Sequence, residues 1–374
     1  MSKQLATLLA TTLALIDQFQ ETVSSSARAE QPSSKDAQAL PLLSASSATL
    51  KAQVTKLSLL TITSPFTHSA VAGVLRACND SVLPSLVTAA MLVTPADYTK
   101  AFQAEVCLLV RAALSEFRVL VVLVKDVLEK KEKEKGEDPK KKEGELVKSE
   151  KEAVTRATGR VWDSCDAVTE VATKGVVGFV MHRVEQWRDL VRDAVQEIEE
   201  WDPEEDDDFF EDLMGEEDKE DDDEDDDDDD DDEDDEEETA ALKEQKKNTL
   251  RFLKPIAQIY PSIATNRLKN AGKAPLSSAG GVAKLEALML NLQSIPEQVD
   301  EAAGALYEAN MAKAAKFLKK TQKHAAQAVE SVASPWNDVA AGDKRVTDKF
   351  SIWSSAWFKV MDEVSKPIDA AATA

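Results

Sequence analysis

The chain has 374 residues, of which 43% are apolar, and carries a formal net charge of −25 at pH 7. This length suggests two or three domains of ordinary size, each with enough apolar residues for a core. The three cysteines, Cys78, Cys107 and Cys165, form no close pair in sequence, which excludes a disulfide framework and fits a reducing compartment. No apolar run reaches the ~18 residues that a membrane-spanning helix needs, so we expect a soluble intracellular protein.

Most of the acidity lies in one segment, residues 204–238, which we call the acidic stretch. It contains 29 carboxylates and one lysine, Lys219, so it carries −28 while the rest of the chain sums to +3. Like charges at this density oppose compaction and leave little apolar surface to bury. The sequence therefore predicts a disordered polyanionic insert within an otherwise nearly neutral protein.

The N-terminal half shows helical periodicity almost throughout. Residues 5–16 resemble the apolar part of a signal peptide, but polar residues follow at once and the apolar positions mark one face of a helix. We expect helices over residues 2–23, 43–63 and 67–90, the last kinked or broken at Pro84. Thr94, followed by Pro95 and by Asp97, predicts the N-terminus of a long helix over residues 95–131, most enclosed at residues 119–124.

A charged linker over residues 130–151 precedes a predicted helical hairpin. Its two arms cover residues 154–172 and 177–201, and Gly175 and Gly178 allow the turn between them. Apolar residues in the second arm recur at alternating spacings of three and four, as in a bundle helix. We expect Trp187 and Trp201, which belong to this stripe, to be largely enclosed.

The same pattern continues after the acidic stretch. Residues 250–260 predict a helix interrupted by Pro255, and residues 285–306 repeat the alternating spacing. Ser294, Pro296 and Glu297 suggest a capping box, hence two helices that meet at a bend, the second reaching residue 331. A last helix after Pro335 carries a stripe of large side chains: Phe350, Trp353, Trp357, Val360 and Val364. The predicted fold is all-α, with helical bundles over residues 1–202 and 239–374 joined through a disordered acidic insert over 203–238.

Known catalytic and metal-binding patterns do not occur. The three histidines are isolated, no Cys-x-x-Cys is present, and Gly272-Lys273 lacks the upstream glycine of a phosphate-binding loop. A Gly-x-Ser-x-Gly motif is also absent. We therefore expect no enzymatic activity, no catalytic residues, no cofactor and no metal site.

The candidate partner-binding residues lie in the acidic stretch. Large apolar side chains lie there among carboxylates, and a segment of this kind can fold when it binds a partner. The alternative is that the segment is a frayed helix end that packs on its own bundle. The candidates are Phe209, Phe210, Leu213, Met214, Asp221, Asp222, Asp223 and Glu224.

Short docking motifs occur as well. Residues 5–9 match Leu-x-x-Leu-Leu, and Arg-x-Leu occurs at Arg118, Arg188 and Arg251. All lie in periodic helices, where we expect the leucines to belong to the core.

In the order and spacing of several segments the chain resembles the cyclin-D-interacting protein family. The segments are Lys56-Leu57-Ser58-Leu59-Leu60 before Pro65, Val161-Trp162-Asp163-Ser164-Cys165-Asp166, Asp193-Ala194-Val195-Gln196-Glu197 before the acidic insert, and Pro296-Glu297-Gln298-Val299-Asp300 before a tryptophan-bearing terminal helix. The similarity covers roughly residues 44–364. The long polyaspartate run and the linker over residues 130–151 exceed the family pattern, which suggests a divergent member.

The resemblance implies an all-helical, non-enzymatic protein of nucleus and cytoplasm. Its expected partners are D-type cyclins and helix-loop-helix proteins, and binding them would restrain cell-cycle progression. The alternative is a histone-chaperone-like or nucleolar protein whose acidic stretch shields basic proteins. Neither interpretation includes direct binding of nucleic acid or membrane.

Overall fold

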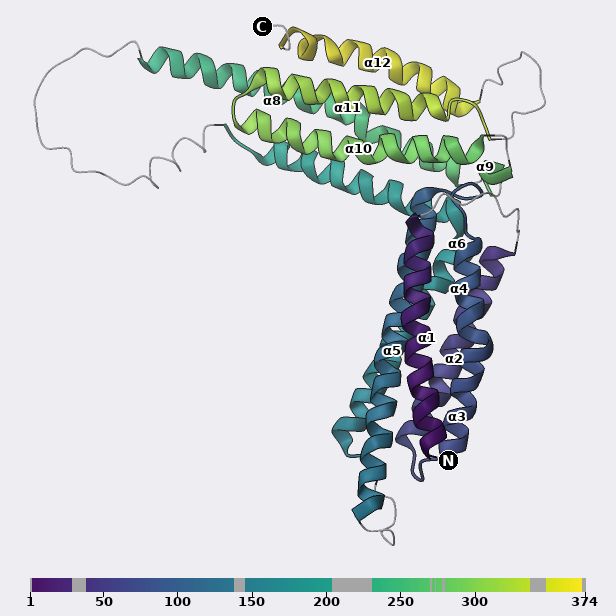
Figure 1. The fold of residues 1–374 in the computed structure, drawn as a ribbon. Helices are drawn as coiled ribbons and strands as arrows, with labels where there is room; N and C mark the ends of the chain where they lie inside the picture. Colours follow the sequence, from purple (N-terminus) through teal and green to yellow (C-terminus); the bar gives the residue numbers. More distant parts are fainter. Residues whose placement is uncertain are drawn as a thin grey trace, which may run out of the picture. The chain divides into compact units, whose positions relative to one another are not determined.

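The computed structural model describes residues 2–28, 38–137, 145–203, 231–269, 271–272, 274–277, 280–336 and 348–371. Every regular element in these ranges is a helix, which confirms the predicted all-α class. None of the described helices is both long and apolar enough to cross a membrane. The helices group into two compact units, Met1–Phe179 and Val180–Ala374, and Figure 1 shows the helices of each.

Unit 1 is a helical bundle. It contains α1 (Ser2–Arg28), α2 (Ala39–Ile62), α3 (His68–Ala77), α4 (Leu83–Leu92), α5 (Lys100–Glu137) and the first part of α6 (Lys148–Glu200). α1 packs against α5 and α3, and α2 packs against α4. α1 continues through Arg28, beyond the predicted end at residue 23, and α2 begins at Ala39 rather than at residue 43.

Polar contacts attach α6 to the other helices of unit 1. The Ser47 hydroxyl of α2 donates to the backbone carbonyl of Cys165 over 2.8 Å, and the Lys51 ammonium pairs with Asp166 over 2.6 Å. Arg160 of α6 pairs with Glu116 of α5 over 3.0 Å. The segment that opened the predicted hairpin is therefore held against α2 and α5.

The predicted break at Pro84 takes the form of a widened helical turn. A π-helical segment, η1 (Cys78–Val82), separates α3 from α4, and the Leu83 N–H donates to the Cys78 carbonyl. Pro84 then lies in the first turn of α4, where a missing N–H leaves no helical hydrogen bond unmade. The wide turn thus lets the chain continue in helical form on both sides of the proline.

The start of α5 differs from the prediction. Thr94 does receive the Asp97 N–H at its hydroxyl oxygen and donates to the Asp97 carboxylate over 2.8 Å, but these bonds close only a short turn. The helix starts at Lys100, and the hydroxyl oxygen of Thr99 accepts the Phe102 N–H over 3.1 Å. Two capping patterns lie in succession, and the second one begins the helix.

Gly175 interrupts α6. Its φ of 64° and ψ of −172° lie outside the helical region, in backbone space that glycine reaches without steric cost. The two arms of the predicted hairpin belong to different compact units, because residues up to Phe179 cluster with unit 1 and those from Val180 cluster with unit 2. The compact units therefore divide near the glycine, 23 residues before the predicted boundary at 202.

Unit 2 combines the second part of α6 with four long helices. These are α8 (Asp231–Ile263), α10 (Gly281–Tyr307), α11 (Met311–Ser331) and α12 (Lys349–Ala371), with the short η2 (Ala264–Leu268) and α9 (Ala274–Ser277) between them. α10 and α11 pack together as a hairpin, and α8 packs against α12 and α11 (Figure 1). α8 begins within the acidic stretch and runs through Pro255 and Pro261 without ending.

Pro296 lies inside α10, which is one continuous helix where the sequence suggested two. A proline at this position leaves the carbonyl four residues earlier without its helical donor. The Tyr260 hydroxyl of α8 donates to that carbonyl, of Leu292, over 3.0 Å, and Tyr260 is fully buried. Ser294 bonds back to the Leu290 carbonyl and does not cap a helix.

The turn between α10 and α11 also was not predicted. Ala309 has a positive φ of 52°, and the side chain of Asn310 accepts the Lys313 N–H at the start of α11 over 3.0 Å. Asn310 is a favourable N-cap, but neither glycine nor proline marks the turn.

A buried arginine joins the ends of three elements in unit 2. Arg267 of η2 donates to the Val332 carbonyl over 2.6 Å and to the Ala333 carbonyl over 2.8 Å, just after α11. It also forms two bonds to Asp348, which accepts the Ser351 N–H at the start of α12. The guanidinium carbon lies 4.4 Å from the ring centre of Phe350. We call this set of contacts the Arg267 cluster.

Candidate partner-binding groove

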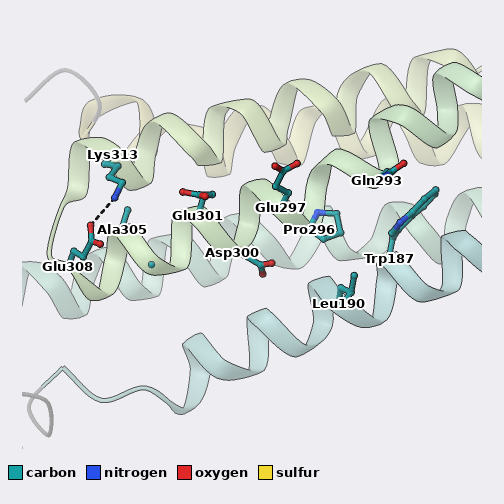
Figure 2. A pocket seen from close by; sticks show the side chains of 11 residues that line it. Trp187, Leu190, Gln293, Pro296, Glu297, Asp300, Glu301, Ala305, Glu308 and Lys313 are labelled. Carbon is teal, nitrogen blue, oxygen red and sulfur yellow. Dashed lines mark hydrogen bonds and ion pairs between the residues drawn. The ribbon is translucent and has the colours of Figure 1, made fainter.

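A groove in unit 2 separates the second part of α6 from α10. Its volume is about 690 Å³, and Figure 2 shows the side chains around it. The lining residues come from α6, α10 and the start of α11: Trp187, Leu190, Gln293, Pro296, Glu297, Asp300, Glu301, Gly304, Ala305, Glu308 and Lys313. We call it the acidic groove.

The α6 wall supplies apolar surface. Val184, Val191 and Ile198 are buried in the core, as the alternating spacing predicts. Trp187 belongs to the same stripe but is only half-buried, and Leu190 is 54% exposed. Trp187 and Trp201, which we expected to be largely enclosed in the N-terminal bundle, are neither fully buried nor exposed, and both belong to unit 2. An exposed leucine beside a half-buried tryptophan is the kind of surface that an apolar side chain of a partner can cover.

The α10 wall supplies negative charge. Asp300 and Glu301 stand three and four residues after Glu297, so both neighbour it on the same side of the helix. Glu308 lies beyond the end of the same helix and pairs with Lys313 over 2.9 Å (Figure 2). The groove therefore contains four carboxylates and one ammonium group, which compensates their negative charge only in part.

The pKa of Asp300 reflects the negative charge of this wall. Burial raises its pKa above the usual range of an aspartate, and the nearby carboxylates of Glu197 and Glu301 raise it further. Like charges at close range disfavour the ionised form, so a positive group placed here would relieve the repulsion. The groove is thus suited to a cationic side chain next to an apolar one.

Contacts around the groove hold its walls in register. The ring of Trp201 at the end of the α6 wall lies 4.8 Å from that of Tyr307 at the end of α10. Lys254 of α8 pairs with Glu199 of α6 over 3.4 Å. The bond from Tyr260 to Leu292 supports α10 one turn before Pro296. Both walls are therefore fixed by contacts outside the groove itself.

The acidic groove was not anticipated from the sequence. The candidates Phe209, Phe210, Leu213, Met214, Asp221, Asp222, Asp223 and Glu224 all lie outside the described residues. A signal existed in the carboxylates of α10 at helical spacing. It was missed because the pairing of that face with Trp187 and Leu190 depends on how α6 packs in unit 2, and no local pattern encodes this.

Unit 1 has a second depression, smaller and more apolar. It has a volume of about 490 Å³ and lies between α2 and α3, lined by Gln53, Lys56, Leu59, Leu60, Ala70, Gly73 and Val74. Leu59 is 56% exposed. We call it the α2–α3 groove; it includes part of the Lys56–Leu60 segment that carried the family resemblance.

The short docking motifs divide according to burial. Leu5 and Leu9 of the Leu-x-x-Leu-Leu match are buried, as are Leu120 and Leu253 of two Arg-x-Leu matches, so these leucines belong to the core as expected. Leu190, which follows Arg188 in the third match, is the exposed residue of the acidic groove.

Reactive or metal-binding groups do not gather at either groove. Within the described part of the chain, no group of three or more histidine, cysteine, aspartate or glutamate side chains is arranged to hold a metal ion. The three cysteines are free and buried, and burial raises the pKa of Cys78 to about 12 and those of Cys107 and Cys165 to about 11. These thiols remain protonated and are poor nucleophiles at neutral pH.

Comparison with known proteins gives a match in the N-terminal part of the chain. This part includes the α2–α3 groove and the α6 wall of the acidic groove. A search of curated proteins found no match. Residues 42–204 match the family model described as Grap2 and cyclin-D-interacting, N-terminal. In this N-terminal region, the chain is similar to the cyclin-D-interacting family.

Proposed function

We propose that this protein is a non-enzymatic regulator that restrains cell-cycle progression by binding a D-type cyclin or a helix-loop-helix protein. The family match over residues 42–204 supports a protein-binding role. The carboxylates and apolar side chains of the acidic groove suit a partner helix that is basic on one side and apolar on the other. We further propose that the protein acts in both nucleus and cytoplasm.

The observation that carries this proposal is the pairing of Trp187 and Leu190 with the carboxylates of α10 across one groove. An amphipathic helix in a groove is a common mode of recognition, read through anchors at helical spacing. Helix-loop-helix proteins of the basic class present such a helix, because their DNA-contacting region is a basic continuation of the bundle helix. Apolar anchors would cover Leu190 while lysine or arginine side chains meet Asp300 and Glu301.

A second function has support in the charge of the acidic stretch alone. A segment of −28 attracts basic proteins such as core histones at low ionic strength. Such binding weakens steeply with salt, since exposed charges are screened beyond about 10 Å at 0.1 M. Binding in a groove with apolar anchors depends less on salt.

The two functions separate in one binding experiment. A D-type cyclin, a basic helix-loop-helix domain and core histones are titrated against the intact protein and against a variant with residues 220–230 replaced by a Gly/Ser linker, in a salt series. We expect the cyclin or the helix-loop-helix domain to bind both versions at 0.15 M salt. Histone binding that disappears with the linker, with no binding of the other two proteins, would contradict the proposal.

A further inference from the structure

One face of α11 carries a row of exposed lysines that neither groove uses. Lys316, Lys319, Lys320 and Lys323 stand at positions i, i+3, i+4 and i+7, so they lie on one side of the helix. All four are exposed. We call this row the lysine stripe.

Nearby groups compensate the lysine stripe only in part. Lys319 pairs with Asp369 of α12 over 3.1 Å, and the Lys320 ammonium lies 4.5 Å from the ring centre of Phe317. Among the described residues, no carboxylate is within ion-pair distance of Lys316, Lys320 or Lys323. The pKa of the neighbouring His324 is lowered, first by burial and then by the charges of Lys323 and Lys320. The stripe is therefore a positively charged surface without a full complement of anions.

The two ends of the acidic stretch are anchored in the same unit as the stripe. Lys246 of α8 donates to the backbone carbonyls of Glu199 and Trp201 at the end of α6. This contact holds the element before the acidic stretch against the element that follows it. The described residues on either side of positions 204–230 therefore both belong to unit 2.

The start of α11 lies next to the part of α8 that follows the acidic stretch. Ala241 and Gln245 of α8 line one depression together with Met311 and Ala312 of α11. Ala241 is three residues after the last acidic residue of the stretch. Lys316 lies five residues after Met311, or about 7.5 Å along a helix that rises about 1.5 Å per residue. The 27 residues at positions 204–230 span up to about 90 Å when extended, far more than this separation requires.

We propose that the lysine stripe of α11 is a docking surface for the acidic stretch of the same chain, chiefly for residues 220–230. Each of these 11 residues is Asp or Glu, so they match a row of ammonium groups without needing a fixed register. A tethered segment also has an effective concentration in the millimolar range, above that of free polyanions. An external nucleic acid would have to displace it and approach a chain of net charge −25.

Docking in this way regulates access to the stripe. While the acidic stretch occupies the lysines, other polyanions are excluded from α11 and basic partners meet a partly neutralised stretch. A strongly basic protein that captures the stretch would expose the stripe in exchange. The interaction consists of exposed charges, so it weakens as ionic strength rises.

The test uses the intact protein at 0.05 M salt and measures how fast a small amine-reactive reagent acylates individual lysines. Mass spectrometry follows the four stripe lysines, with exposed Lys359 of α12 as the internal control. We expect acylation of the stripe to be several-fold slower in the native protein than in the variant with residues 220–230 replaced by Gly/Ser, and Lys359 to be unchanged. Raising salt to 1 M should remove the difference without any mutation, which also guards against misfolding of the variant.

A zero-length carbodiimide cross-linker identifies the occupant. We expect links between residues 220–230 and the stripe within one chain, tested with a mixture of isotopically labelled and unlabelled protein. Equal acylation rates in the two proteins, or cross-links from the acidic stretch only to lysines outside α11, would overturn the proposal. Cross-links found only between labelled and unlabelled copies would make a second chain the occupant and would overturn it as well. Equal affinity of the native protein and the Gly/Ser variant for a short DNA duplex at the stripe would overturn it too.

Discussion

At the scale of single residues, Arg267 is a buried charge whose contacts join η2, the end of α11 and the start of α12. Its side chain is 4% exposed, and it satisfies two carbonyls after α11 and a carboxylate before α12. A buried charge without its partners is strongly unfavourable, whereas a fully bonded one fixes the geometry of what surrounds it. Arg267 therefore determines where α12 begins relative to η2 and α11.

Replacing Arg267 with alanine should destabilise unit 2 by about 3–5 kcal/mol, because two carbonyls and Asp348 lose their donor together. Lysine at this position should restore little of the lost stability, since it lacks the planar guanidinium that donates to several acceptors at once. Lys366, an exposed lysine paired with Glu363, gives the matched control, and its alanine variant should lose less than about 1 kcal/mol. Denaturant unfolding measures both; equal losses for the two variants would show that the Arg267 cluster has no special role.

Asp348 adds a dependence on pH. The Arg267 side chain, which donates hydrogen bonds to it, lowers the pKa of this carboxyl from 3.8 to about 2, with further lowering by the Ser351 N–H. A lowered folded-state pKa adds stability above the unfolded-state value, and this stability is lost as pH falls from about 4 to about 2.

The difference in unfolding free energy between the native protein and Asp348→Asn should therefore be about 2 kcal/mol at pH 6 and close to zero at pH 2. Comparing the two proteins at each pH cancels the titration of the acidic stretch, which both share. A difference that stays constant from pH 6 to pH 2 would contradict the assignment of this pKa.

At the scale of elements, the sequence predicted periodicity better than connections. The apolar stripes of α6 and α10 were predicted correctly, because spacing alone determines which face of a helix is buried. Pro296 was misread as a helix boundary, because the Tyr260 hydroxyl that replaces its missing bond lies 36 residues away in sequence. Gly175 was recognised as a turn, but the sequence does not show that the chain passes there from one compact unit to the other.

Gly175 should tolerate substitution poorly. Alanine at a φ of 64° is strained by about 1–2 kcal/mol. A Cβ added at Gly159, inside α6, meets no side chain within 4 Å, so alanine there should stabilise the helix by up to about 1 kcal/mol. Thermal unfolding of the two variants should thus shift in opposite directions. A Gly175→Ala protein that melts like the native one would mean that α6 is not broken at this residue.

At the scale of the whole molecule, two kinds of recognition surface are distinct. Apolar anchors and carboxylates meet in the acidic groove, whereas the lysine stripe and its proposed occupant, residues 220–230, would meet through charge alone. The acidic groove could not be predicted from the sequence, because it forms only when α6 and α10 lie side by side. The net charges of the chain and of its acidic stretch were evident at once. Their relation to α11 depends on the contacts of Lys246 and on the packing of α8 beside α11.

Binding of an amphipathic partner helix in the acidic groove can be tested with two leucines of unit 2. Leu190 lies in the groove and is 54% exposed, whereas Leu290 lies on α10, is 66% exposed and does not line the groove. The measurement is the dissociation constant of a basic helix-loop-helix domain for the native protein, Leu190→Asp and Leu290→Asp at 0.15 M salt. We expect binding at least about tenfold weaker for Leu190→Asp, as for a residue at the centre of an interface, and within about twofold of native for Leu290→Asp. Equal affinities for all three proteins would contradict it.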